Sequence, residues 1–291
     1  MNSKLKTNYH THTSFCDGKS TAEEMVKAAI QKKFDILGFS SHSMYPFGET
    51  WHIAPRDHAP YAKEIARLKK AYKNKIEILT GFEADFIPSL CMPSHERFEE
   101  FNPDYLIGSV HYIRNEKGFV TVDETASGVK AGIDKLFNGN GKKFTQEYFY
   151  LEREMLKHGD FEILGHCDLI RLRNQEIHFF NEEESWYKSE LKALVKAIKK
   201  SGIIVELNTG AIARKLMDDI YPSSPLLELL HDANVPITIN SDAHKTTTLD
   251  AAFDIAQKKA RDAGYTECAL IKKGRIEMQP LKCTPIIGHL N

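Results

Sequence analysis

The sequence predicts an α/β protein whose strands form one barrel-like parallel sheet. Two observations support this prediction. Seven short apolar runs of strand length alternate with stretches of helical periodicity, which is the pattern of parallel strands joined by right-handed crossovers. Histidines and acidic residues gather at the C-terminal ends of these runs, where a closed barrel places its active site. We therefore expect a single catalytic domain over residues 1–291.

Composition indicates an ordinary globular protein. The chain has 291 residues, of which 42% are hydrophobic and 27% charged, and its formal net charge is -1. This balance gives no general attraction to nucleic acid or to an anionic membrane, so an anionic ligand has to be held locally. The chain shows no leader sequence and no apolar run of the roughly 20 residues that span a bilayer. The 5 cysteines never form a Cys-x-x-Cys pair, which fits a reducing compartment, and we expect a cytoplasmic protein.

The first strand leads directly into His10-Thr11-His12. Alternate side chains of an extended segment share a face, so both histidines are expected to point the same way. The first helix is expected to begin after Thr21, because Thr21 and Glu24 have capping-box spacing. A buried strand over 34–42 then ends in His42, and a helix is predicted near 61–72.

The alternation continues to the end of the chain. Five further strands are predicted over 76–85, 105–111, 161–168, 203–210 and 235–244. Helical patterns lie between and after them, at 129–158 with a break at the turn 138–141, and at 182–201, 226–231 and 250–263. No internal repeat or low-complexity segment is visible.

Nine potential metal ligands lie at or just beyond strand ends. They are His10, His12, Asp17, His42, Glu83, His111, His166, Asp242 and His244. Nine donors are too many for one ion, and they predict two or three divalent ions, Zn, Mn or Fe, with Glu83 as the candidate bridging ligand. Three such ions against three carboxylates leave about three surplus positive charges, which favours a phosphate group as ligand. The other seven histidines, His52 among them, are expected to be ordinary surface or partly buried residues.

These motifs resemble the polymerase-and-histidinol-phosphatase superfamily, the PHP phosphoesterases. The resemblance covers residues 8–263 and rests on His10-Thr11-His12 with Asp17, on Gly81-Phe82-Glu83, on Ser109-Val110-His111, on Gly165-His166-Cys167-Asp168 and on Ser241-Asp242-Ala243-His244. It implies a distorted (β/α)7 TIM-like barrel with a trinuclear site. By this likeness one ion takes His10, His12, Glu83 and Asp242, a second takes Glu83, His111 and His166, and a third takes Asp17, His42 and His244.

Within the superfamily, the aspartate at position 17 and the single-domain length resemble the histidinol-phosphatase branch. That likeness implies hydrolysis of L-histidinol phosphate. Arg171 and Arg214 each follow a strand end and are expected to bind the phosphate of the small substrate, although Ile212-Ala213 departs from the branch's usual glycine-leucine step.

Catalytic roles are expected for Asp17, His42, Asp242 and His244. The sequence does not decide which of Asp17, His42, His244 or a water protonates the leaving group. Asp168 is expected either to orient a ligand histidine or to cap the following helix. The loops 44–58 and 119–140, with Phe47, Trp51, Phe119 and Phe137, are expected to wall the organic part of the substrate.

Two other classes of function stay open. The same metal site suits a nuclease or nucleotide phosphoesterase, although the sequence offers no basic groove with interleaved aromatic residues. A non-catalytic, metal-stabilised binding module is the second alternative, disfavoured because the ligand set is complete. The sequence does not indicate an oligomeric state or the identity of the metal.

Overall fold

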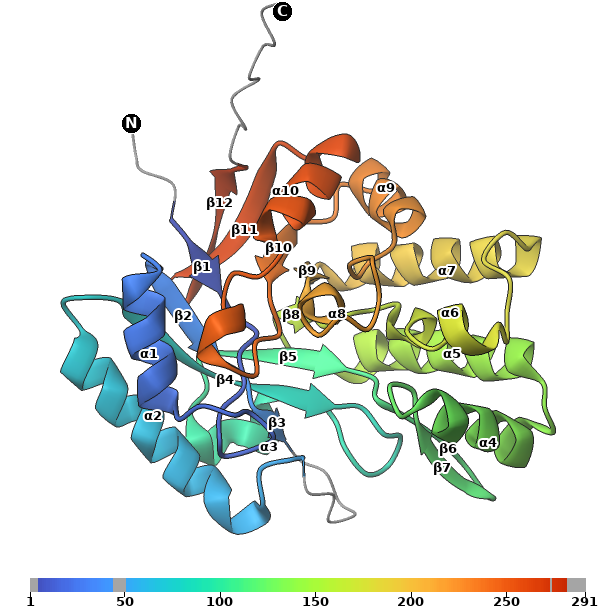
Figure 1. The fold of residues 1–291 in the computed structure, drawn as a ribbon, viewed down its shortest axis with the longest axis horizontal. Helices are drawn as coiled ribbons and strands as arrows, with labels where there is room; N and C mark the ends of the chain where they lie inside the picture. Colours follow the sequence, from blue (N-terminus) through green and yellow to red (C-terminus); the bar gives the residue numbers. More distant parts are fainter. Residues whose placement is uncertain (1–4, 44–50, 273, 282–291) are drawn as a thin grey trace, which may run out of the picture.

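The computed structural model describes residues 5–43, 51–272 and 274–281. Within these residues, seven parallel strands form a nearly closed barrel, in the order β1-β2-β4-β5-β8-β9-β10 (Figure 1). Their bounds are Thr7–Asn8 (β1), Ile36–Phe39 (β2), Glu77–Asp85 (β4), Tyr105–Ser109 (β5), Ile163–Leu164 (β8), Ile204–Asn208 (β9) and Ile237–Asn240 (β10). A two-residue strand, β3 (His42–Ser43), also pairs with β4. The predicted barrel is confirmed. The extent of the domain, 1–291, stays a prediction.

Backbone pairing between the first and last strands is sparse, and a side chain helps to close the barrel there. The path of paired strands ends at β1 on one side and β10 on the other. Across this seam the Tyr9 N–H donates to Asn240 Oδ1 at 2.9 Å. Beyond it, Thr11 forms an isolated parallel bridge with Ala243, and the His12 N–H donates to the Ala243 carbonyl at 2.9 Å. An amide side chain therefore replaces part of the ladder, which accounts for the distorted shape.

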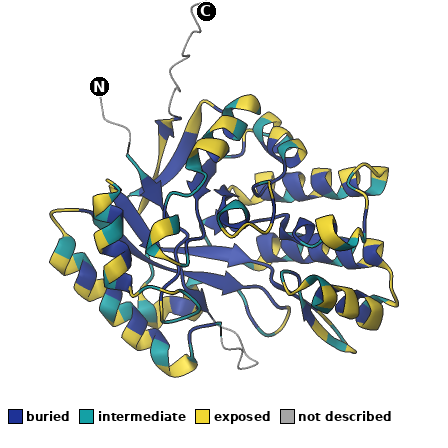
Figure 2. Cartoon of the chain, viewed as in Figure 1, coloured by how far each residue is buried: buried dark blue, intermediate teal, exposed yellow. Residues whose placement is uncertain are grey.

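Helices surround the sheet, with α1 and α2 on one side and α4, α5 and α7 on the other (Figure 1). Their inward faces are buried and their outward faces exposed (Figure 2). The described helices are α1 (Ala22–Gln31), α2 (His58–Tyr72), α3 (His95–Phe98), α4 (Ala126–Phe137), α5 (Gly141–His158), α6 (Asn174–Ile177), α7 (Ser185–Ser201), α8 (Gly210–Ala213), α9 (Ser224–Asp232) and α10 (Phe253–Asp262). The capping box at Thr21 and Glu24 is present, as predicted. None of the described helices is long and apolar enough to cross a membrane.

Two antiparallel hairpins were not predicted. One consists of β6 (Tyr112–Asn115) and β7 (Gly118–Thr121), directly after β5. The other consists of β11 (Glu267–Lys272) and β12 (Arg275–Pro280), which lies beside β1 and β10 (Figure 1). The stretch 119–140, named as a loop but predicted to be helical from 129 onward, holds the end of β7 and all of α4. Cys16 and Cys167 form no disulfide among the described residues, and Cys283 lies outside those residues.

Tyr105 of β5 fills the barrel below the mouth. Its hydroxyl donates to the Tyr9 carbonyl at 2.5 Å and to the Phe39 carbonyl at 3.1 Å, so one side chain ties three strands together. Glycines face the ring on two neighbouring strands. A Cβ at Gly38 would lie 2.4 Å from the Tyr105 hydroxyl, and one at Gly81 would lie 2.5 Å from Cζ. These strands need glycine because the tyrosine occupies the space.

We predict that Gly38→Ala destabilises the fold by about 1–3 kcal/mol through overpacking against Tyr105. Because the hydroxyl is the nearest atom, the same substitution should cost less in a Tyr105→Phe background. Urea unfolding of the four proteins of this double-mutant cycle measures the difference. Equal costs in the two backgrounds would contradict the contact.

Glu152 is a buried acid on the side of α5 that faces the core. Burial raises its pKa well above the ordinary value, and Tyr148 and His111 only partly offset this effect. The native protein therefore keeps a proton on Glu152 that the unfolded chain releases above a pKa of about 4.3. Because the native state binds more protons, this group makes stability fall as pH rises from about 4.3 toward the raised value.

Glu152→Gln should remove this contribution. We expect the fall in urea midpoint between pH 5 and pH 8 to be smaller in the variant, and the variant to be the more stable protein at pH 8. Glu154→Gln, on the same helix but paired with Lys157 and His158, is the matched control. Parallel pH profiles for wild type and Glu152→Gln would show that Glu152 does not titrate differently in the two states.

Candidate metal centre

The structure brings all nine predicted ligands to the C-terminal mouth of the barrel. Strand register explains how the first and last groups meet. Thr11 lies opposite Ala243 in a parallel bridge. Side chains alternate along an extended segment, so the residues on either side of Thr11 and of Ala243 point to the same face of the sheet. His10 and His12 therefore lie beside Asp242, with His12 Nε2 3.1 Å from Asp242 Oδ1. The parallel pairing of His42 with Glu83, between β3 and β4, adds the next two ligands.

Glu83 lies at the centre of the cluster and is only 1% exposed. Its two oxygens face different histidines. Oε2 lies 3.0 Å from His10 Nε2, 3.5 Å from His12 Nε2 and 3.0 Å from His42 Nδ1. Oε1 lies 2.9 Å from His166 Nε2 and 3.4 Å from His111 Nε2. A carboxylate divided in this way is placed to bridge two cations, which is the role that the sequence suggested for it.

A second carboxylate, Asp17, lies toward solvent from Glu83. Its Oδ2 is 3.1 Å from His244 Nε2, and its Oδ1 is 4.0 Å from His42 Nε2 and 3.9 Å from His12 Nδ1. Donor atoms of Asp17, His12, His42 and His244 all lie within 4.8 Å of one another, as do those of two further groups. The further groups are His10, His12 and Glu83, and His42, Glu83 and His111. The three groups overlap, because His12, His42 and Glu83 each belong to two of them, and the number of ions stays a prediction.

Charge in the cluster is tightly coupled. Burial acts to raise the pKa of Glu83, but the imidazoles of His10, His42 and His111 hold it well below its ordinary value. Burial also opposes the protonated form of His111, yet Asp85 and Glu83 raise its pKa to about 10. The pKa of His12 is instead lowered to about 3, because burial disfavours its charged form and His244 and His42 lie alongside. The carboxylates thus carry negative charge that protons on imidazoles, or metal cations, must balance.

The donor set fits divalent metal ions. His10 Nε2, His12 Nε2, His42 Nδ1 and Glu83 Oε2 are buried, and none has a hydrogen-bond partner among the described residues, despite their short separations. Imidazole nitrogens and carboxylate oxygens aimed at one another in this way lack hydrogen-bond geometry but suit ions held between them. Metal ligation by the individual residues stays a prediction.

A second layer of side chains holds the ligands, and sequence reasoning missed most of it. Glu206 of β9 contacts His10 Nδ1 at 2.9 Å and accepts from the His166 N–H at 2.9 Å. Asp85 contacts His111 Nδ1 at 2.7 Å and, through its other oxygen, His52 Nε2 at 2.6 Å. His52, expected to be ordinary, therefore lies directly behind the cluster. The sequence does hold a signal for both acids. Asp85 lies two residues after Glu83 and therefore on the same face of the strand, and Glu206 is a charged residue within an otherwise apolar run.

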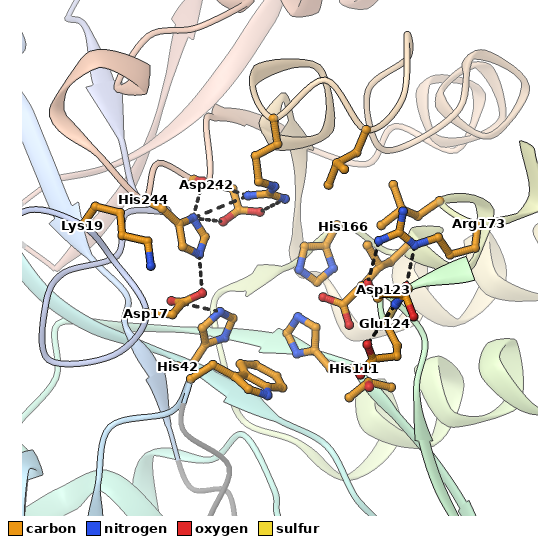
Figure 3. Close-up of a pocket in the computed structure, with 17 residues that line it drawn as sticks. Asp17, Lys19, His42, His111, Asp123, Glu124, His166, Arg173, Asp242 and His244 are labelled. Carbon is orange, nitrogen blue, oxygen red and sulfur yellow. Dashed lines mark hydrogen bonds and ion pairs between the residues drawn. The ribbon is translucent and has the colours of Figure 1, made fainter. Parts of the chain in front are cut away.

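The cluster opens into a cavity of about 500 Å³ (Figure 3). Six of the nine predicted ligands line it, and His10, His12 and Glu83 lie beneath. The cavity is also lined by Lys19, Trp51, Arg173, Arg214, Thr121, Asp123, Glu124, Thr125 and three leucines.

The two predicted phosphate-binding arginines differ in their placement. Arg214 lies in the cavity wall, where its guanidinium donates to Asp242 Oδ2 at 3.0 Å. Arg171 is buried away from the cavity lining and donates to Asp219 at 2.8 Å and to Glu182 at 3.1 Å. Its guanidinium is therefore already neutralised by carboxylates, and this arrangement gives no support to phosphate binding by Arg171. Arg173, two residues further on, lines the cavity instead.

Asp168 and the aromatic residues have other partners than expected. The Asp168 side chain makes no capping hydrogen bond; its Oδ2 accepts from the Ser223 N–H at 2.8 Å. Trp51 does line the cavity, with its ring 4.7 Å from that of His42 in an edge-to-face contact. Phe119 packs on Tyr112, Phe137 packs on Phe144, and neither lines the cavity. Phe47 lies outside the described residues.

Comparison with known proteins agrees with this geometry. A family model of the PHP domain matches residues 8–210, which is more than half of the chain. The chain belongs to the PHP domain family. Among curated proteins it is 27% identical to a probable histidinol-phosphatase of Schizosaccharomyces pombe, over 91% of this chain and 89% of that protein. It is 24% identical to the histidinol-phosphatase of Bacillus subtilis, over 86% of this chain and 97% of that one.

Solved PHP structures share the fold. The hisK protein of Listeria monocytogenes superposes with a TM-score of 0.77 at 22% identity, covering 86% of this chain and 99% of its own. The histidinol phosphate phosphatase of Lactococcus lactis superposes with a TM-score of 0.67 at 21% identity, covering 94% and 98%. That second structure is a complex with zinc, L-histidinol and phosphate.

We predict that Glu206→Gln weakens metal binding about 10–100-fold, because it removes the negative charge that orients His10. Elemental analysis after dialysis against graded chelator concentrations measures the loss, and circular dichroism checks that the fold is retained. Glu190→Gln, which breaks an ion pair with Arg153 between α5 and α7, is the control for loss of one acid elsewhere. Equal metal retention in the two variants would contradict the role of Glu206.

Proposed function

We propose that this protein hydrolyses L-histidinol phosphate to L-histidinol and phosphate in a metal-dependent reaction. The observation that carries the proposal is the convergence of imidazole and carboxylate donors around Glu83 at the floor of a cavity of about 500 Å³. A cavity of this size accepts a small molecule. Relatives named histidinol-phosphatase, and the Lactococcus lactis complex with histidinol and phosphate, support the choice of substrate.

Two or three divalent ions, Zn, Mn or Fe, would be held by the nine donors. We assign them to the three sets that the family resemblance implies: His10, His12, Glu83 and Asp242; Glu83, His111 and His166; and Asp17, His42 and His244. When bound, such ions activate water as a nucleophile and neutralise charge on phosphoryl oxygens. Glu206 and Asp85 support this by fixing the ring orientations of His10 and His111.

Side chains at the mouth would bind the phosphate and move the proton. Arg214 presents a guanidinium whose Nη1 and Nη2 already contact Asp242, so its charge is fixed at the cavity wall where phosphate oxygens arrive. Asp17 holds the His244 ring at 3.1 Å, and both line the cavity together with His42. We propose that the proton required by the departing alcohol oxygen comes from this side of the cavity, either from one of these residues when it holds no ion or from a water beside them.

The nuclease alternative has less support from the cavity. Its outer wall carries the acidic side chains of Asp123 and Glu124, which would repel a second phosphate of a polynucleotide. The non-catalytic alternative has no feature of its own in its favour, because the donor set is complete.

The test is a comparison of initial rates on histidinol phosphate, nucleotide monophosphates, sugar phosphates and single-stranded DNA, with Mn-, Zn- and Fe-loaded protein. We expect histidinol phosphate to be preferred and a chelator to abolish the activity. Asp242→Asn should lower kcat/KM at least about 100-fold, because it removes a charge that faces His10, His12 and Arg214. Asp134→Asn, an exposed acid on α4, is the control.

Two results would contradict the proposal. Faster hydrolysis of DNA than of any small monoester would favour the nuclease. Activity of Asp242→Asn equal to wild type on every monoester would favour a non-catalytic metal-binding module.

A further inference from the structure

The cavity has charges of opposite sign at its two ends. Lys19 lies at one end, beside Asp17 and His244, and Asp123 and Glu124 lie at the other, beyond His111 and His166 (Figure 3). The apolar side chains of Leu169, Leu172 and Leu216 also line the cavity. A ligand that spans the cavity would meet a cation at one end and carboxylates at the other, with apolar side chains also in the lining. This arrangement suits a molecule that carries a phosphate and a positive charge.

Most carboxylates of the cavity already have partners. Asp242 accepts from Arg214 and faces His12, and Asp17 pairs with His244. Glu124 is exposed, and its Oε1 accepts from the Thr125 N–H at 3.0 Å. Asp17 and Asp242 are therefore committed to the donor cluster, whereas Glu124 lies exposed at the outer wall.

Asp123 differs from them. It is half-buried and lines the cavity, and within the described part of the chain its carboxylate makes no hydrogen bond or ion pair. Figure 3 places it between Arg173 and the rings of His111 and His166. A carboxylate in this position has free acceptor oxygens.

The backbone around Asp123 is held in place independently of its side chain. Arg173 donates through Nε to the Glu124 carbonyl at 2.5 Å and through Nη2 to the Asp123 carbonyl at 3.2 Å. One residue earlier, the Val122 N–H donates to the carbonyl of His111 at 2.8 Å. The N–H groups of Arg173 therefore donate to main-chain oxygens and to Glu176, and they do not neutralise the Asp123 carboxylate. The segment is fixed relative to the metal centre, as a binding residue requires.

We propose that Asp123 binds the protonated amine of the substrate and so selects phosphate monoesters that carry a cationic nitrogen close to the ester. The inference rests on the proposed phosphatase function and adds a determinant of specificity to it. L-histidinol phosphate meets the requirement, because its ammonium group is on the carbon next to the one that bears the phosphate ester. Asp123 lines the same cavity as the predicted metal ligands, so a phosphate held at those ligands would leave the amine in the cavity that this carboxylate lines. A charge-assisted hydrogen bond there discriminates more strongly than apolar contact alone.

The test uses matched pairs of substrates that differ only in the amine. Histidinol phosphate is compared with its deamino analogue, 3-(imidazol-4-yl)propyl phosphate, and O-phosphoethanolamine is compared with ethyl phosphate. Wild-type protein should prefer the amine of each pair, and Asp123→Asn should lower kcat/KM for the amine about 10–100-fold while changing the neutral ester less than about threefold. Asp134→Asn removes the same charge from the surface of α4 and should leave both ratios unchanged.

Metal content separates a specific effect from damage to the centre. Elemental analysis should give the same metal content for Asp123→Asn as for wild type. Equal loss of activity on both members of a pair, or an unchanged preference for the amine, would overturn the role of Asp123. Failure of the proposed function gives a different result, because histidinol phosphate is then not hydrolysed. In that case the comparison of O-phosphoethanolamine with ethyl phosphate decides whether Asp123 recognises an amine.

Discussion

The structure depends on one electrostatic constraint, the burial of the Glu83 carboxylate at the mouth of the barrel. A buried carboxylate without compensation costs several kcal/mol, so it is stable only when positive charge surrounds it. Five imidazole nitrogens lie within 3.5 Å of its two oxygens, and the charges of His10, His42 and His111 lower its pKa. Those imidazoles come from four separate places in the chain, and only a closed parallel sheet brings such segments within 4 Å of a single side chain. The same arrangement that stabilises the acid gathers donor groups that could hold metal ions.

Backbone strain at Asp242 is part of this arrangement. Asp242 adopts φ of +50°, in the left-handed region that non-glycine residues rarely occupy. Its carbonyl is contacted by Arg214 Nη1 at 3.3 Å and by His244 Nδ1 at 3.0 Å, and its carboxylate by Arg214 Nη2. These contacts offset the cost of the conformation, which turns Asp242 and His244 toward the cluster. Strain of this kind is characteristic of functional sites, where surrounding contacts determine the geometry. Arg214 therefore also has a structural reason to occupy the cavity wall.

Local signals predicted the barrel and the cluster, whereas the supporting layer depends on tertiary partners. An apolar run that stops at a histidine or an acid, as at His111 and Glu83, indicates the end of a strand. Because a parallel barrel gathers the C-terminal ends of its strands at one face, such residues can be predicted to lie close together. No feature of the neighbouring sequence indicates that Arg173, and not Arg171, lines the cavity. Only the positions of Asp219 and Glu182 decide that Arg171 is neutralised in the interior. His52 likewise looked ordinary because its partner Asp85 is 33 residues away. The two hairpins were not predicted because strands such as β7 and β12 are mostly exposed or half-buried and lack the continuous buried run of the parallel strands.

Net charge is a poor guide to ligand charge in this protein, and the cavity explains why. The whole chain has a formal charge of -1, yet donor groups that could hold metal cations gather around Asp17 and Glu83. At physiological salt, surface charges are screened beyond about 8 Å, so a bound molecule responds to the lining of the cavity rather than to the total. A small ligand is short enough to meet the cationic floor and the acidic wall at once. A polynucleotide would extend past both, and its additional phosphates would gain nothing from a balanced surface.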